Sequence, residues 1–109
     1  MKHLLLSLLL ALSLSASAQT ATVKTTYYRL KGRTASGMTT QNGICAVSPD
    51  LERKGFKLGE YILLEYKDGR KQKLLIADRT AKRIKNTVDI WSATPIPNQT
   101  KVKATLWKK

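Results

Sequence analysis

Short apolar and β-branched segments recur along the chain after its first 18 positions, separated by residues that favour turns. Segments of this length and spacing are typical of strands in an all-β domain, and no stretch has the periodicity of a long amphipathic helix. The pair Asp68-Gly69 between two such segments predicts a tight hairpin turn. The predicted strands are residues 22–28, 43–47, 61–66, 71–77, 87–91 and 101–107.

The connections between these segments differ in character. Residues 32–37 are a loop of small polar residues, 49–59 are a longer connection with charged residues in its middle, and 80–86 are a polar, basic stretch that fits a single helical turn. Six short strands in one small domain favour a closed barrel, because closure leaves no exposed sheet edge.

The first 18 residues have the three parts of a secretory signal peptide. Lys2 supplies the positive start, residues 4–14 the mostly apolar core, and Ala16 and Ala18 the small residues that precede cleavage. The core is about 11 residues long, against the roughly 20 that a helix needs to cross a bilayer. We therefore expect an exported protein, periplasmic or extracellular, whose mature form is one domain of residues 19–109 without stable membrane insertion.

The chain is strongly basic, with a formal net charge of +13, and all seven acidic residues lie in the predicted mature part. Such a charge favours anionic partners. Export argues against nucleic acid and leaves cell-wall polymers, lipopolysaccharide and membrane phosphates. Lysines that only keep the protein soluble would give the same composition. A surface without a dedicated binding patch therefore stays an open alternative.

Two residue types limit the chemistry. The single histidine, His3, lies in the predicted signal peptide, so the mature chain has no histidine base, no Ser-His-Asp system and no histidine-rich metal site. Cys45 is the single cysteine, which leaves an intermolecular disulfide open but no internal one. Its apolar context is typical of a small buried residue. We expect neither a metal nor another cofactor.

Asp78 and Asp89 stand out among the acidic residues because apolar strand residues precede or flank them. Asp78 directly follows Leu74-Leu75-Ile76-Ala77 at a strand end, where partial burial raises a carboxyl pKa. Asp89 lies between Val88 and Ile90, so its side chain points away from the face that both neighbours share. Two carboxyl groups facing one groove are the minimum for cleaving a glycosidic bond. Turn formation through backbone hydrogen bonds is the alternative for both residues.

The chain also contains six short motifs in sequence order. They are Tyr27-Tyr28, Gly32-Arg33-Thr34-Ala35-Ser36-Gly37, Gly43-Ile44-Cys45-Ala46-Val47-Ser48-Pro49, Leu58-Gly59, Ala77-Asp78-Arg79-Thr80 and Val88-Asp89-Ile90-Trp91. In order and approximate spacing they resemble the double-psi β-barrel proteins of the cell wall, namely the rare lipoprotein A-like family and the three-aspartate domain that also forms part of membrane-bound lytic transglycosylase A. The resemblance covers residues 25–106, nearly all of the predicted mature chain.

This resemblance implies a six-stranded double-psi β-barrel with an open groove for a glycan strand of peptidoglycan. In enzymes of this kind an aspartate acts as acid and then as base, while the 6-hydroxyl of the N-acetylmuramoyl unit attacks its own anomeric carbon. Asp78 matches the aspartate of the family's Asp-Thr-Gly or Asp-Arg-Gly turn and is the implied acid and base. Asp89 matches the aspartate of a later Ile-Asp-Leu segment and is expected to orient groups or stabilise charge. The implied substrate-binding residues are Tyr27, Tyr28, Thr34, Ser36 and Trp91.

The chain departs from the family pattern at three positions. Ser48 stands where the three-aspartate pattern has an acid, Met38 where rare lipoprotein A-like enzymes usually have a glutamate, and Thr80 where glycine follows the Asp-Arg pair. Two functions therefore stay open. One is a peptidoglycan-cleaving enzyme of the lytic transglycosylase or glycosidase type. The other is a non-catalytic wall-binding barrel, comparable to expansin-like proteins, whose aromatic residues stack on sugar rings. Core packing is the alternative role for those aromatic residues.

Overall fold

The computed structural model describes residues 19–108, and the predicted signal peptide lies outside these residues. The described chain contains six strands and one short helix. They are β1 (Thr20–Tyr28), β2 (Ile44–Val47), α2 (Pro49–Arg53), β3 (Tyr61–Glu65), β4 (Lys71–Arg79), β5 (Thr87–Trp91) and β6 (Gln99–Trp107). The predicted all-β fold is confirmed, and no strand end differs from its predicted position by more than two residues.

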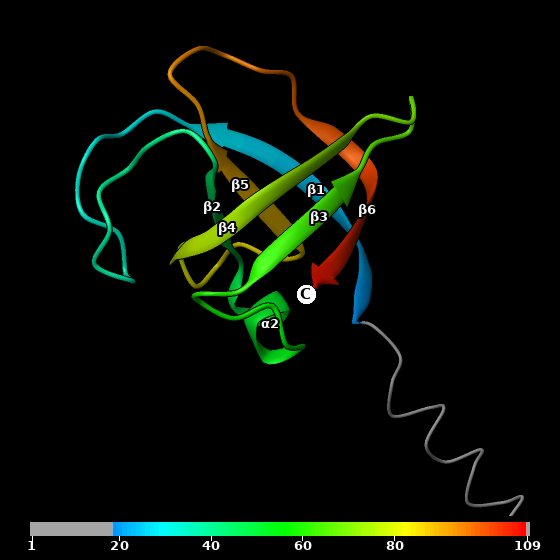
Figure 1. Ribbon diagram of the computed structural model, residues 1–109, viewed down its shortest axis with the longest axis horizontal. Coiled ribbons are helices and arrows are strands. Elements are labelled where there is room, and N and C mark those ends of the chain that lie inside the picture. Colours follow the sequence, from blue (N-terminus) through cyan, green and yellow to red (C-terminus); the bar gives the residue numbers. More distant parts are fainter. Residues whose placement is uncertain (1–18, 109) are drawn as a thin grey trace, which may run out of the picture.

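The strands close into a barrel in the order β1-β5-β2-β4-β3-β6. The pairs β1–β5 and β2–β4 are parallel, and the other pairs are antiparallel. Exchanging the first three strands with the last three leaves this order unchanged, so the two halves have the pseudo-twofold relation of a double-psi barrel. In Figure 1, β3 and β4 cross in front of β1 and β5, which belong to the opposite wall.

Side chains point alternately into and out of the barrel along each strand. On β6, for example, Val102 and Ala104 are fully buried, whereas Lys103 between them is exposed. Phe56, from the connection between β2 and β3, is fully buried in the same core. Burial of each large apolar side chain stabilises the fold by roughly 1.5–3 kcal/mol. Cys45 is also fully buried in this core, and burial raises the pKa of its thiol well above its usual range.

A β-bulge in β4 determines which way the end of this strand faces. Cys45 of β2 is register-paired with Ile76, but the next residue, Ala46, is paired with Asp78, so Ala77 is an extra residue on β4. Regular alternation from Ile76 would turn Asp78 into the interior. The bulge instead places Asp78 beside Ala46 on the outer face of the barrel.

The connection between β1 and β2 packs against the outside of the barrel, where it covers a second, smaller hydrophobic cluster. This cluster consists of Ile44, Ala77 and Trp91, with Tyr28, Met38 and Leu75 packed against it. The indole Nε1 of Trp91 donates a hydrogen bond to the carbonyl of Leu30 (2.9 Å), and the backbone N–H of Ser36 donates to the carbonyl of Ala77 (3.0 Å). These bonds hold the start and the middle of the loop against the strands that carry the aspartates.

Two connections differ from the sequence prediction. Residues 49–53, expected to be irregular, form α2, and Pro49 is suited to its first turn because no intrahelical N–H donor is needed there. Residues 80–86 form turns and irregular structure, not a helical turn. The helix α2 is short, and nothing in the described part of the chain forms a helix long and apolar enough to cross a membrane.

Candidate functional site

A cleft of about 1030 Å³ opens on the outer surface of the barrel. Residues of β1, β5, β2, the end of β4 and the start of β6 line it, together with parts of the segments 30–33 and 80–85. Small-molecule sites usually have volumes of roughly 300–1,000 Å³, so the cleft is large enough for an extended ligand. Asp78 and Asp89 both line it.

The barrel brings these two aspartates together through a shared neighbour. Ala46 on β2 is register-paired with Asp78 on β4 and with Asp89 on β5. Side chains of paired residues project to the same face of a sheet. The three side chains therefore form one row across the cleft, and the backbones of the two aspartates lie about 10 Å apart, two strand spacings.

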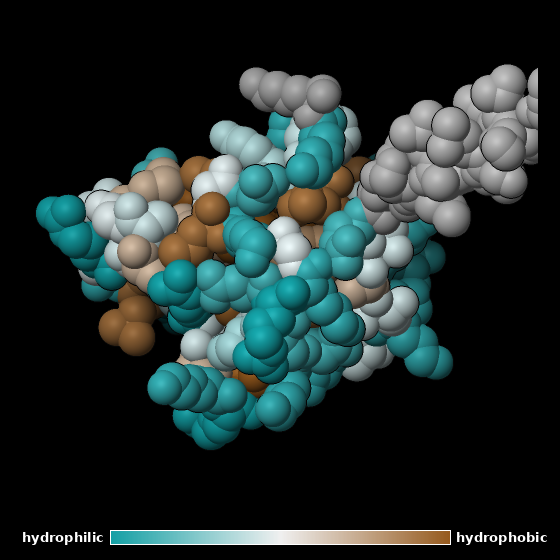
Figure 2. Space-filling model, turned by 90° about the horizontal axis from the view of Figure 1, so that it is seen from below, coloured by the Kyte–Doolittle hydropathy of each residue, from teal (hydrophilic) through white to brown (hydrophobic). Residues whose placement is uncertain are grey.

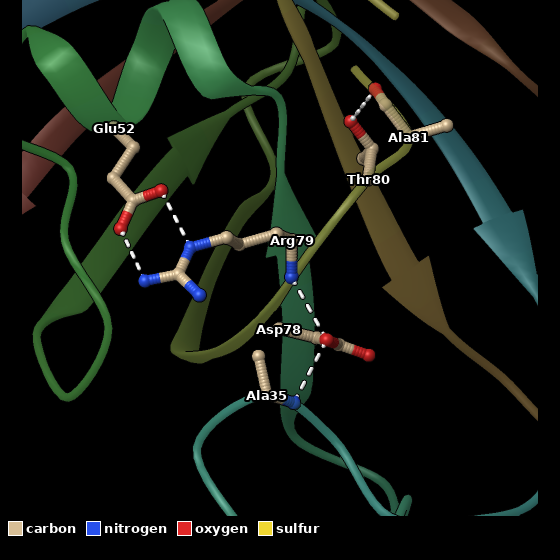
Figure 3. Close-up of polar contacts among 6 residues, drawn as sticks. All are labelled: Ala35, Glu52, Asp78, Arg79, Thr80 and Ala81. Atoms are coloured by element: carbon tan, nitrogen blue, oxygen red, sulfur yellow. Dashed lines mark hydrogen bonds and ion pairs between the residues drawn. The ribbon is translucent and has the colours of Figure 1, made fainter.

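Asp78 is held by backbone donors at one carboxylate oxygen, and its other oxygen has no hydrogen-bond partner among residues 19–108. Its Oδ1 accepts hydrogen bonds from the N–H groups of Ala35 and Arg79, both at 2.9 Å, as Figure 3 shows. The guanidinium of Arg79 points away from this carboxylate and makes a two-bonded ion pair with Glu52 (2.8 and 3.0 Å). Oδ2 of Asp78 therefore stays available for a ligand in the cleft.

Asp89 is more enclosed than Asp78. Its Oδ1 accepts a 2.6 Å hydrogen bond from the hydroxyl of Thr26 on the neighbouring strand β1. Burial raises the pKa of the Asp89 carboxyl above its usual value, and the bond from Thr26 opposes this shift in part. Asp89 thus retains a proton to higher pH than an exposed aspartate does.

The hydroxyl of Tyr28 completes a cluster with the two aspartates. It is fully buried and has no hydrogen-bond partner within residues 19–108. Burial raises the pKa of Tyr28 far above its usual range, and the nearby charges of Asp78 and Asp89 raise it further. Leaving a buried hydroxyl unpaired costs about 1–3 kcal/mol, so this group is a candidate for bonding a ligand in the cleft.

Positively charged side chains surround the cleft. They are Lys24, Lys31, Arg33, Arg79, Arg83 and Lys85. Of these, Arg79 is the one that forms an ion pair with another residue of the described chain. The others create a positive potential that attracts anionic ligands. Figure 2 shows a surface on which hydrophilic residues predominate, with smaller hydrophobic areas between them.

Tyr27 and Trp91, two of the aromatic residues expected to bind substrate, lie outside the cleft. Tyr27 is half-buried and shares the inward face of β1 with its register partner, Ile90. Trp91 is 8% exposed, belongs to the second hydrophobic cluster and uses its Nε1 to hold Leu30. Of the three aromatic residues expected to bind substrate, Tyr28 is the one that lines the cleft.

Thr34 and Ser36 shape the loop that holds Asp78, and neither is among the residues lining the cleft. Their hydroxyl groups share a 2.9 Å hydrogen bond, and the hydroxyl of Thr34 donates to the carbonyl of Met38 (2.9 Å). Ala35, which lies between them, donates its N–H to Asp78. Both residues therefore act on the site through the position of this backbone donor.

Of the three departures from the family pattern, Ser48 and Met38 lie outside the cleft, whereas Thr80 lines it. Ser48 is fully buried, and its Oγ accepts a hydrogen bond from the N–H of Thr87 (2.9 Å), which ties the start of β5 to the end of β2. The side chain of Met38 packs against the second hydrophobic cluster. In the part of the chain described, no three acidic, histidine or cysteine side chains gather as a metal site would require.

Two contributors to the site escaped the sequence analysis. Thr26, which holds Asp89, is one of several threonines in a β-strand and carries no local signal. The N–H of Ala35 is a backbone group, which side-chain motifs do not reveal. The net charge indicated a cationic surface. It did not indicate that so many of the cationic side chains border one cleft.

Comparison with known protein families gives no match, and comparison with curated proteins gives none either. Among solved structures, the chain is similar to the Streptomyces papain inhibitor, with a TM-score of 0.64 and 19% sequence identity. The similarity covers 83% of this chain and 96% of the inhibitor. At this level of identity the likeness concerns the fold, a small β-barrel.

Proposed function

We propose that this protein binds the glycan strands of peptidoglycan and cleaves them, as a lytic transglycosylase or a related glycosidase. One observation carries the proposal: Asp78 and Asp89, from different strands, face one cleft lined with cations. Glycosidic cleavage needs one carboxyl group to protonate the leaving oxygen and benefits from a second that faces the developing positive charge. The six sequence motifs support peptidoglycan as the polymer.

The surroundings of the two aspartates favour Asp89 as the proton donor. Burial raises the pKa of Asp89, so this residue carries a proton over a wider pH range. Asp78 has one oxygen fixed by two N–H donors and the other free, which suits a fixed carboxylate facing the anomeric carbon. This assignment reverses the roles that the sequence resemblance implied.

The proposed reaction needs no water. The proton of Asp89 moves to the glycosidic oxygen as the bond to the anomeric carbon breaks, and the bonding electron pair leaves with that oxygen. The 6-hydroxyl oxygen of the same sugar unit then bonds to the anomeric carbon, and its proton returns to the Asp89 carboxylate. The products are a free hydroxyl on the leaving strand and a 1,6-anhydro end.

Purified sacculi provide the direct test. The native chain should release anhydro-muropeptides, and Asp89→Asn should lower the rate by about 10²–10⁴-fold, the usual contribution of an acid–base group. Asp68→Asn, in the exposed hairpin turn, is the matched control and should leave the rate unchanged. Release by Asp89→Asn at the native rate would contradict the assignment of the proton donor, and no release by the native chain would contradict catalysis.

A non-catalytic wall-binding barrel is the second candidate. The position of Met38 favours it, because the glutamate that related enzymes usually have is replaced here by a side chain packed into a hydrophobic cluster. This candidate predicts that the native chain sediments with sacculi without releasing soluble products. It also predicts that Asp89→Asn sediments as well as the native chain.

A further inference from the structure

The outer face of β4, β3 and β6 is a regular surface on the barrel wall opposite β1 and β5. The residues pair across the three strands in rows. The rows are Leu75–Tyr61–Trp107, Lys73–Leu63–Thr105 and Lys71–Glu65–Lys103. We call these nine side chains the basic-aromatic face. It lies on the strands nearest the viewer in Figure 1, together with the neighbouring β6.

Two large rings lie exposed side by side on this face. Tyr61 is 37% exposed and Trp107 is 40% exposed, although they are direct cross-strand partners. The ammonium of Lys73 lies 4.8 Å from the ring centre of Tyr61 and 4.6 Å from that of Trp107. Cation–π contacts of this kind contribute about 0.5–1 kcal/mol at exposed sites. The rings and the charge therefore form one ordered platform.

The charge of the face is positive. Three of its side chains are lysines, and its single carboxylate, Glu65, is register-paired with Lys71 on one side and Lys103 on the other. Lys73 has no acidic partner among residues 19–108. The positive charge that is left over lies beside the two rings.

We infer that the basic-aromatic face is a second binding site for an anionic polysaccharide. Flat, exposed aromatic rings suit the apolar side of a pyranose ring, and the ammonium of Lys73 suits a carboxylate carried by the polymer. A protein partner fits less well, because the cores of protein interfaces are depleted in lysine, whereas the ammonium of Lys73 lies over both rings here. A sheet face is also open along its length, as a long chain of sugars requires.

The site would keep the protein on its polymer while the cleft acts. The two surfaces lie on different walls, so they would engage different strands or different parts of one strand. Two weak sites on one insoluble polymer raise the overall affinity by about 10²–10⁴-fold without any new contact. The choice of peptidoglycan as the polymer rests on the proposed function, whereas the chemistry of the face does not.

Sedimentation with sacculi tests this inference, using protein expressed from the full-length sequence. The double variant Tyr61→Ala/Trp107→Ala should bind sacculi at least about 10-fold more weakly than the native chain. It should still release anhydro-muropeptides from short soluble glycans at the native rate, since the cleft is unchanged. Lys73→Gln should lower the preference for sacculi over chitin, an uncharged polysaccharide. Lys54→Gln, which removes an equal charge at the end of α2, should not change this preference.

The outcomes separate this inference from the proposed function. If the native chain releases no product but the double variant still loses binding, the proposed function falls and the second site stands. Native-like binding by the double variant overturns the second site. So does equal binding of the native chain to chitin and sacculi, tighter binding to phosphatidylglycerol vesicles than to sacculi, or a native dimer that the double variant converts to a monomer. If the double variant fails to fold, the Lys73→Gln variant, which retains both rings, tests the inference. An unchanged preference for sacculi over chitin in this variant would then overturn the second site.

Discussion

The two walls of the barrel differ in regularity. The basic-aromatic face belongs to antiparallel strands whose register continues without a break over five residues on each side of β3. The wall that carries the cleft contains both parallel pairs, the bulge at Ala77, a half-buried carboxyl group at Asp89 and the unpaired hydroxyl of Tyr28. Each of these features costs stability. Such features persist in native proteins mainly where function requires them, so the irregular wall is the better place to look for chemistry.

Substitutions at the central residue of each wall should show the largest difference in product release and in stability. Ala46 lies between the two aspartates and is 4% exposed, so Ala46→Leu should cost about 1–3 kcal/mol of unfolding free energy by overpacking. Displacement of the aspartates should also lower product release by about 100-fold. Leu63→Ala, at the centre of the basic-aromatic face, should leave product release from soluble glycans unchanged. Equal loss of release in both variants would remove the distinction between the walls.

The two tryptophans allow the same substitution on each wall. Trp91→Phe keeps a buried ring but removes the hydrogen bond to Leu30, and should lower the free energy of unfolding by about 0.5–1.5 kcal/mol. Trp107→Phe removes no such bond and should change it by less than about 0.5 kcal/mol. Denaturant titrations of both variants measure the difference. A larger loss for Trp107→Phe would contradict the packing described here.

Two aspartates should affect stability with opposite dependence on pH. The pKa of Asp89 is raised by burial, so the folded state holds more protons, and native stability falls as pH rises from about 4 through the folded pKa. Asp89→Asn should therefore gain stability relative to the native chain between pH 3 and pH 7. Asp68, in the hairpin between β3 and β4, has a pKa lowered by its hydrogen bonds from Arg70, so its contribution is present at neutral pH and is lost on acidification. Asp68→Asn should lose stability relative to the native chain over the same rise in pH, as thermal unfolding at several pH values would show.

The smallest expected effect concerns the hydroxyl that holds Asp89. Thr26→Val removes the 2.6 Å bond that opposes the raised pKa of Asp89, so the alkaline limit of the pH–rate profile, where Asp89 loses its proton, should move upward. Thr105→Val, on the basic-aromatic face, should leave the profile in place. An unshifted profile for Thr26→Val would show that Asp89 is not the titrating acid.

Local patterns predicted the fold better than the site. The six strands follow from alternation and turn residues, and the outward direction of Asp89 follows from its apolar neighbours. The outward direction of Asp78 does not, because it depends on a bulge that appears only when β4 is paired with β2. Trp91 carries an aromatic signal that suits a sugar site, yet a loop distant in sequence covers it. The helix α2 escaped prediction because its five residues are too few for a helical period to show.

The enclosed position of Cys45 has a practical consequence. A thiol with no exposed surface and a raised pKa does not react with alkylating reagents, and the chain has no other cysteine. One cysteine introduced on either wall would therefore be the single site for a fluorescent or spin label. Occupancy of the cleft and of the opposite face could then be followed separately in otherwise identical molecules.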